Sequence, residues 1–168
     1  ASDLVSGDNN GRIDVFVRDR TLGQTVLVSV DSGGNSSGSG DSYSPRFTAD
    51  GRKVAFASTA DNLVTNDNNG TADAFVRDLA TGVTVLASVN TNGVSGNGIS
   101  GPPVITPDGR YVAFLSAAGD LVGNDTNGLN DAYRRDLVSG VTELASGNPS
   151  GQAGNRLSFH PVISSDGR

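Results

Sequence analysis

The sequence repeats itself with a period of about 58 residues. Three kinds of landmark carry the repeat: the prolines Pro45, Pro103 and Pro161, the Asp-Gly-Arg triplets that begin at Asp50, Asp108 and Asp166, and the aromatic residues Phe16, Phe75 and Tyr133. The prolines and the triplets recur at intervals of 58 residues, and the aromatic residues at intervals of 59 and 58. A fixed period shared by unrelated landmarks indicates tandem structural units.

Each unit reads as four short strands, and no segment has the apolar spacing of a helix. We expect first strands at 45–48, 103–106 and 161–164, second strands at 53–58 and 111–116, third strands at 14–19, 73–78 and 131–136, and fourth strands at 24–30, 83–89 and 141–146. The Asp-Gly pair between the first and second strands favours a hairpin turn.

The second strand is apolar on both faces. Val54 and Phe56 lie on one side of the strand, and Ala55 and Ala57 lie on the other. A strand of this kind is covered on both sides. Four-stranded antiparallel sheets that stack face to face are the blades of a β-propeller. The sequence therefore predicts an all-β fold with about three blades of a β-propeller or a propeller-like assembly.

Two stretches carry a resemblance to a known family. They are TADGRKVAFAS followed by DAFVRDLATGVTVLAS, and TPDGRYVAFLS followed by DAYRRDLVSGVTELAS. They resemble the TolB-type (WD40-like) β-propeller repeat, in the variant of bacterial secreted proteins that has DxNGxxD loops. The resemblance covers essentially the whole chain and implies a propeller fold. The polar loop is longer and more regular here than in the usual repeat.

The repeat also predicts the blade boundaries. Residues 1–44 hold the third and fourth strands of a partial blade and a spacer, 45–102 and 103–160 hold one blade each, and 161–168 hold the first strand of a further blade. Three blades do not close a ring. We expect either the remaining blades of a longer chain or other copies of this chain to complete the end blades, in a closed ring or a filament.

Each unit contains a polar loop of the form Asp-x-Asn-Gly-x-x-Asp. Calcium takes about 6–8 oxygen ligands, and the side chains at positions one, three and seven can converge with the carbonyl oxygen of position five. The glycine at position four lets the backbone fold tightly. The predicted ligands are Asp8, Asn10, Arg12 and Asp14 in the first loop, Asp67, Asn69, Thr71 and Asp73 in the second, and Asp125, Asn127, Leu129 and Asp131 in the third.

The loops therefore predict about three Ca²⁺ sites with an affinity on the order of 10⁻⁴ M, as in extracellular modules. Three Ca²⁺ ions would balance the formal net charge of −6. A metal-free alternative remains open. Asn-Gly also favours a tight hairpin turn, and Asp side chains also cap local N–H groups.

Composition excludes several classes of function. The net charge of −6 opposes binding to nucleic acid. No apolar run approaches the ~18 residues that a membrane-spanning helix needs, so we expect no insertion into a membrane. The chain has one histidine, His160, and no cysteine. Its only GxSxG match, residues 34–38, lies in a Gly/Ser-rich spacer and not at a strand-to-helix turn, so no nucleophile elbow appears with that histidine. We therefore expect a protein that is not an enzyme.

These observations predict a calcium-stabilised β-propeller scaffold that is extracellular, on the cell surface or periplasmic. Its partners would be other copies of itself or the remaining blades of a longer chain. Two alternatives remain: a propeller module that binds a glycan or a peptide (or protein) ligand through its loops, and the propeller domain of a larger enzyme.

Overall fold

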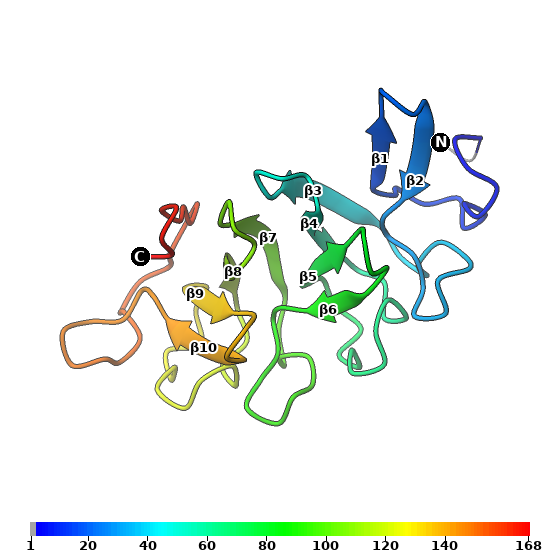
Figure 1. Ribbon diagram of the computed structural model, residues 1–168. Helices are drawn as coiled ribbons and strands as arrows, with labels where there is room; N and C mark the ends of the chain where they lie inside the picture. The colour runs from blue at the N-terminus through cyan, green and yellow to red at the C-terminus, as the bar shows by residue number, and fades with distance from the viewer. Residues whose placement is uncertain (1–2) are drawn as a thin grey trace.

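The repeats fold as separate antiparallel sheets that follow one another in chain order (Figure 1). The computed structural model describes residues 3–168, and in these residues there are ten strands and no helix, hence none long and apolar enough to cross a bilayer. The strands are β1 (Phe16–Asp19), β2 (Gln24–Leu27), β3 (Ser42–Phe47), β4 (Lys53–Ser58), β5 (Asp73–Asp78), β6 (Thr84–Leu86), β7 (Ser100–Ile105), β8 (Tyr111–Ser116), β9 (Asp131–Asp136) and β10 (Val141–Leu144).

Two of the sheets are complete four-stranded blades. Strands β3 to β6 form one and strands β7 to β10 form the other, each in sequential order, while β1 and β2 form a two-stranded pair. Phe56 lies opposite Phe75 across β4 and β5, and Phe114 lies opposite Tyr133 across β8 and β9. In both pairs the rings stack with their centroids 5.8 Å apart. The predicted all-β fold of four-stranded blades is confirmed.

The sheets pack through one aromatic face and one face of small residues. Val54 and Phe56 belong to a buried cluster with Val15 and Val28 of the preceding unit. Ala55, on the opposite face of β4, belongs to a second cluster that includes Phe114 of the following unit. The predicted strand that is apolar and covered on both faces is confirmed. The aromatic face of each blade packs against the small residues of the blade before it.

The strand ends differ from the predicted ones. Strands β3 and β7 begin at Ser42 and Ser100, three residues before the prolines, and each contains a register shift. A bulge lets a proline, which has no N–H to donate, remain inside a strand. The third strand of the first unit begins at Phe16 instead of residue 14. The fourth strands end early, at Leu27, Leu86 and Leu144.

Residues 161–164, where the repeat predicts another first strand, are not a strand in the structure. A strand requires a neighbour that completes its hydrogen bonds, and no second strand of that unit follows within residues 3–168. The blade boundaries at 44, 102 and 160 remain predictions.

Candidate metal centre in the polar loops

The second and third polar loops join β4 to β5 and β8 to β9, the first precedes β1, and all three close in a tight turn. In the second loop the Asn69 side-chain oxygen accepts a hydrogen bond from the Thr71 N–H at 2.7 Å, and Gly70 has a φ of +65°. The same bond joins the asparagine to position five in the other two loops, also at 2.7 Å. The repeated local sequence thus produces the same turn three times.

The asparagine amide group binds two oxygens at once. The Asn69 Nδ2 donates to Asp73 Oδ2 at 2.6 Å and to the carbonyl oxygen of Gly96 at 2.7 Å. Exchanging the amide nitrogen and oxygen would place an oxygen against both acceptors, so these partners fix the orientation of the amide. The Asn69 oxygen keeps a second lone pair beside its bond to Thr71, so its predicted role as a ligand stays a prediction.

A serine that the sequence analysis missed, buried in the first two units, donates a hydrogen bond to the last aspartate of each loop. Ser88 donates to Asp73 Oδ1 at 2.6 Å, and its oxygen accepts the Ala74 N–H at 3.0 Å. The equivalent bonds join Ser29 to Asp14 and Ser146 to Asp131, both at 2.5 Å. The repeat period was the available signal, because Ser29, Ser88 and Ser146 are separated by 59 and 58 residues.

The first aspartate of the first two loops lies buried without a hydrogen-bond partner. Asp8 and Asp67 are only 5% and 7% exposed, and neither oxygen of either carboxylate has a partner within the described residues. Burial of such a charge is costly unless an opposite charge compensates it. Burial raises the pKa of Asp67, and burial together with the charge of Asp67 raises the pKa of Asp73 to about 7.

These loops offer the donor set that suits a hard divalent cation. Within residues 3–168 no group of three or more His, Cys, Asp or Glu side chains gathers, so each loop supplies two carboxylates at most. The carbonyl oxygens of position five, in Arg12, Thr71 and Leu129, accept no hydrogen bond from the described residues. Two carboxylates, one free carbonyl oxygen and water are ligands that calcium uses, and the unpartnered oxygens of Asp8 and Asp67 fit that ion.

The third loop differs at its first aspartate. Asp125 is 5% exposed, and its Oδ2 accepts a hydrogen bond from the Tyr133 hydroxyl while its Oδ1 accepts the Asn127 N–H at 3.4 Å. Burial and the neighbouring Asp125 raise the pKa of the Tyr133 phenol, which therefore remains protonated. Phe16 and Phe75 occupy the equivalent positions in the first two units and have no hydroxyl.

Each loop also holds the linker that enters the next blade. Beside the Asn69 bond to Gly96, the Ser95 N–H donates to the Asn66 carbonyl at 2.9 Å, and the Ser100 N–H donates to the Ala72 carbonyl at 2.7 Å. From the other side, Asp120 of the following unit accepts the Asn97 N–H at 2.9 Å. Hydrogen bonds from the polar loop and from the following unit therefore hold the linker between two consecutive units. We call this set of hydrogen bonds a bracket.

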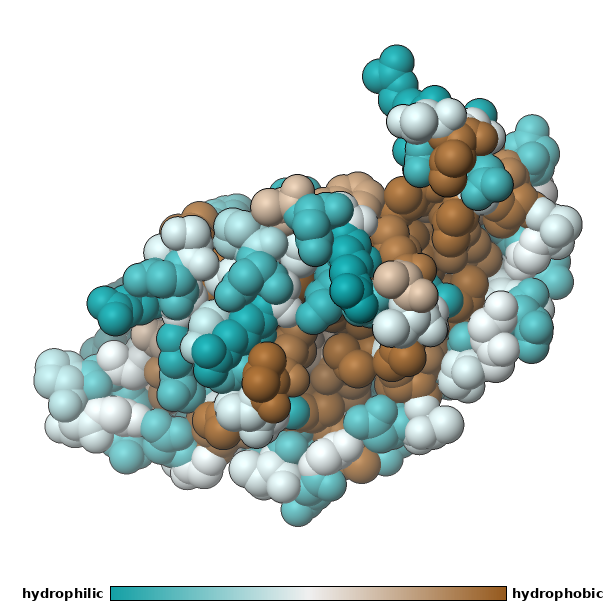
Figure 2. Space-filling view, in the orientation of Figure 1, coloured by the Kyte–Doolittle hydropathy of each residue, from teal (hydrophilic) through white to brown (hydrophobic). Residues whose placement is uncertain are grey.

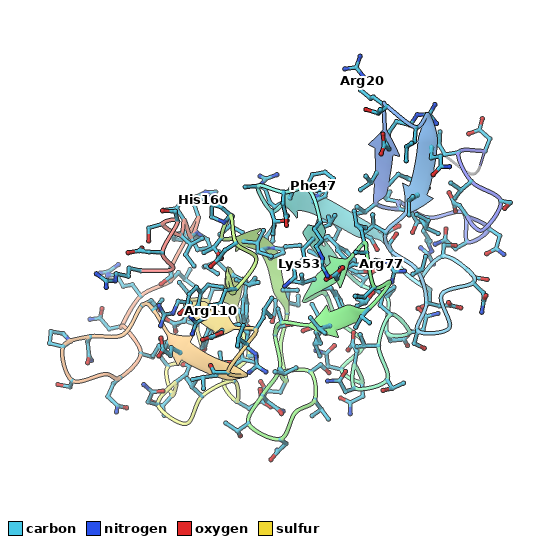
Figure 3. All side chains as sticks on the ribbon, viewed as in Figure 1. Arg20, Phe47, Lys53, Arg77, Arg110 and His160 are labelled. Carbon is cyan, nitrogen blue, oxygen red and sulfur yellow. The ribbon has the colours of Figure 1, made fainter. Side chains whose placement is uncertain are left out.

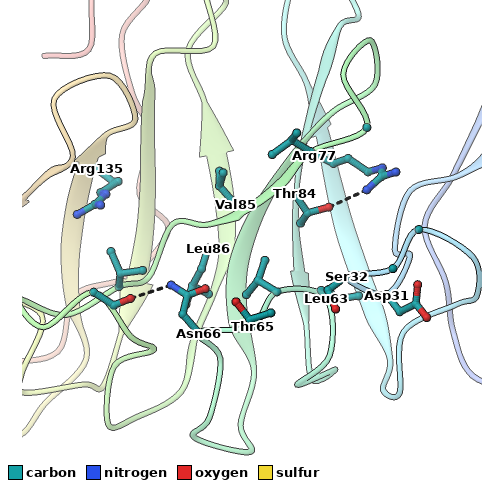
Figure 4. Close-up of a pocket in the computed structure, with 17 residues that line it drawn as sticks. Asp31, Ser32, Leu63, Thr65, Asn66, Arg77, Thr84, Val85, Leu86 and Arg135 are labelled. Carbon is teal, nitrogen blue, oxygen red and sulfur yellow. Dashed lines mark hydrogen bonds between the residues drawn. The ribbon is translucent and has the colours of Figure 1, made fainter.

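A groove of about 580 Å³ lies between the linker after β2 and the blade of β3 to β6, and Asp31 is the one acidic residue that lines it (Figures 2 and 4). Apolar side chains line it on one side, among them Val83, Val85 and Leu86, and Arg77 and Arg135 lie at its edge. The Arg77 guanidinium donates to Thr84 at 2.8 Å. His160 is exposed, lies near the C-terminal segment (Figure 3), and makes no side-chain hydrogen bond with the described residues.

Comparisons with known proteins support the fold. No family model and no curated protein matches the sequence. Among solved structures, TolB from Agrobacterium tumefaciens superposes with a TM-score of 0.53 at 18% identity, over 82% of this chain and 39% of that one. This chain thus spans well under half of the TolB structure. The tricorn protease matches with a TM-score of 0.46 at 14% identity, over 83% of this chain and 12% of that one.

The propeller domain of the trilobed protease from Pyrococcus furiosus matches with a TM-score of 0.38 at 16% identity, over 62% of this chain and 27% of that one. At these identities the likeness concerns the fold alone, and it rests on the TolB superposition. The two complete meander sheets, stacked through their aromatic and small faces, agree with that superposition. The chain has a TolB-like β-propeller fold.

Proposed function

We propose that this chain is a non-enzymatic β-propeller scaffold whose polar loops are held by calcium. One observation carries the proposal: the carboxylates of Asp8 and Asp67 are buried, and none of their oxygens has a hydrogen-bond partner in the described residues. A buried carboxylate without compensation is rare in a stable fold. A divalent cation supplies the missing charge and accepts the free oxygens as ligands.

The two aspartates of a loop have different parts in this arrangement. Ser88 and Asn69 fix the Asp73 carboxylate in one orientation before any ion binds. Asp67 provides two free oxygens, and the carbonyl of Thr71 provides another. When bound, calcium supplies the positive charge that keeps these groups together. Because the ion binds the folded loop only, its binding free energy adds to the stability of the fold.

The position of the loops connects calcium binding with the packing of one blade against the next. Each loop brackets the linker into the next blade, so a cation that orders the loop also fixes one blade against the next. Loops with only two carboxylates bind calcium weakly, at about the concentrations found outside cells. This supports a location that is extracellular, on the cell surface or periplasmic. Other copies of the chain, or further blades of a longer one, are the proposed partners at its ends.

The proposal is tested by thermal unfolding with calcium and with chelator. At a calcium concentration of about 100 times Kd each site adds about 2.7 kcal/mol, which in a chain of this size raises Tm by about 5–10 °C. Mg²⁺ at the same concentration serves as the control and is expected to raise Tm less, because it demands six short bonds in strict octahedral geometry. Identical melting curves in calcium and in chelator would contradict the proposal.

Recognition of a glycan or a peptide is a second candidate function, favoured by the groove in Figure 4. It combines an apolar wall with the guanidinium groups of Arg77 and Arg135. Burial lowers the pKa of both arginines, so both groups are partly removed from water and suited to an acidic ligand. Binding of acidic glycans or peptides that persists in chelator and is lost in Arg77→Ala would support this function.

A further inference from the structure

The second and third polar loops make the same hydrogen bonds to their last aspartate and differ in the surroundings of their first. In both, a serine donates to the last aspartate, at 2.6 Å from Ser88 and 2.5 Å from Ser146. In both, the asparagine amide donates to that aspartate at 2.6 Å. The stacked aromatic pairs behind the loops have the same centroid distance of 5.8 Å. Two side chains differ beside the first aspartate: Tyr133 stands where the second unit has Phe75, and Ala153 stands where it has Ser95.

That hydroxyl changes the surroundings of the first aspartate. Asp67, beside Phe75, has two buried oxygens that accept no hydrogen bond of normal geometry, although the Ser95 hydroxyl and the Asn69 N–H lie near enough to lower its pKa in part. Asp125, beside Tyr133, accepts the hydroxyl hydrogen bond at one oxygen and the Asn127 N–H at the other. Both oxygens of Asp125 thus have a donor, and a hydrogen atom points at the carboxylate from the side of the aromatic core.

We propose that the Tyr133 hydroxyl takes the place of the cation in the third loop, so that the chain binds two calcium ions, in its first two loops, and its third loop stays closed without metal. This inference rests on the proposed calcium function of the loops. A cation at Asp125 would have to displace a hydrogen bond that a carboxylate accepts from a buried donor, and such bonds are among the strong ones. Neither Asp8 nor Asp67 presents that obstacle.

A third loop that stays closed without metal makes one of the three connections between units independent of calcium. The bracket around the linker at Gly154 forms through Asn127 at 2.6 Å whether calcium is present or not. The brackets at Gly38 and Gly96 depend on the ion, because the carboxylates behind them lack compensation. Calcium therefore controls the first two connections between blades and leaves the third unaffected.

Calorimetric titration with Ca²⁺ alone tests the inference on the intact chain. The wild type is expected to bind two ions. Tyr133→Phe deletes only the hydroxyl and is expected to bind three. Phe75→Tyr, the matched variant that places a hydroxyl beside Asp67, is expected to bind one. In chelator, Tyr133→Phe is expected to melt below the wild type, because it leaves Asp125 with an unpartnered oxygen, and calcium is expected to close that gap.

Two results would overturn the inference while leaving the proposed function intact. The first is three ions of equal affinity on the wild type. The second is the loss of an ion in Tyr133→Phe. That loss would mean that the hydroxyl donates to the Ala118 carbonyl, 3.2 Å away, and offers its own oxygen to the metal. No binding by any of the three proteins would overturn the proposed function and this inference together. If Phe75→Tyr does not fold, the wild type and Tyr133→Phe still decide the question.

Discussion

At the scale of single residues, the two aspartates of the second loop differ in the hydrogen bonds that their carboxylates accept. Asp73 is fully buried but has a serine donor and an amide donor. Asp67 is buried as well, and neither of its oxygens accepts a hydrogen bond of normal geometry. The two carboxylates differ because the Ser88 hydroxyl and the Asn69 amide donate to Asp73 only. This difference predicts that a substitution of Asp67 changes Tm in opposite directions with and without calcium.

Asp67→Asn is expected to raise Tm in chelator and to lower it in calcium, both relative to the wild type. Without metal the substitution removes a buried charge that nothing compensates, and such a charge costs more than a buried amide. With metal it removes a ligand. Asp61→Asn serves as the matched control, because Asp61 is exposed on the same loop, and it is expected to change Tm little in either condition. A change of the same sign in both conditions would contradict this explanation of Asp67.

At the scale of structural elements, the linkers after β2 and β6 are packed so closely that they require glycine. A Cβ atom on Gly96 would lie 2.7 Å from Leu121 and 2.8 Å from Ala118, under the base of the next loop. We expect Gly96→Ala to lower the free energy of unfolding by about 1–3 kcal/mol through overpacking. Gly119→Ala is the control, because no atom lies within 4 Å of the added Cβ. Equal denaturation midpoints for the two variants would refute this.

The Asp-Gly turns are a second element with a defined pH dependence. The Thr106 hydroxyl donates to Asp108 at 2.5 Å, and this bond lowers the pKa of Asp108 below its ordinary value of 3.8. Because the pKa is lower in the folded state, the stabilisation is present above pH ~4 and is lost as the pH falls through the folded pKa. Thr106→Val is expected to move the Asp108 pKa back towards 3.8 and to weaken this acid dependence.

An NMR titration of the aspartate carboxyl groups measures that change. Asp50 belongs to the equivalent turn of the preceding unit, where Thr48 donates at 2.6 Å, and it provides an internal reference in the same sample. An Asp108 pKa that stays where it was in the Thr106→Val variant would show that the hydroxyl is not the cause.

The strands and turns were the most predictable part of this protein. Strands β4, β5, β8 and β9 have the predicted bounds, because short strand-length segments and the Asp-Gly turns are local signals. The starts of β3 and β7 were not predictable, since a bulge around a proline depends on the neighbouring strand. Ser88 was missed for a related reason. A serine near the end of an apolar strand carries no local sign of its bond to Asp73, fifteen residues earlier in the chain, and only the repeat period pointed to it.

At the scale of the whole molecule, the stacking of sheets explains why the repeat has a fixed length. The aromatic face around Phe56 packs on the preceding unit, and the small residues around Ala55 receive Phe114 of the following unit. The sequence indicated both faces but not which neighbour each one meets. The metal-loop motif predicted the two aspartates, whereas the difference that Tyr133 makes at Asp125 became visible only in three dimensions.

Calcium is expected to make unfolding more cooperative across the chain. In repeat architectures the coupling between neighbouring units decides whether they melt together, and the polar loops bracket the linkers between units. Differential scanning calorimetry should give a ratio of van't Hoff to calorimetric enthalpy near one in calcium and a lower ratio in chelator. A ratio that is the same in both conditions would mean that the loops do not couple the blades.

The central claim is that a cation compensates the buried carboxylates of the polar loops. The most direct measurement is the anomalous difference density of crystals grown with calcium. We predict a strong peak in the loop 67–73, bonded to the carboxylates of Asp67 and Asp73 at about 2.3–2.6 Å. Density for water alone beside Asp67, in a folded chain at saturating calcium, would contradict the claim.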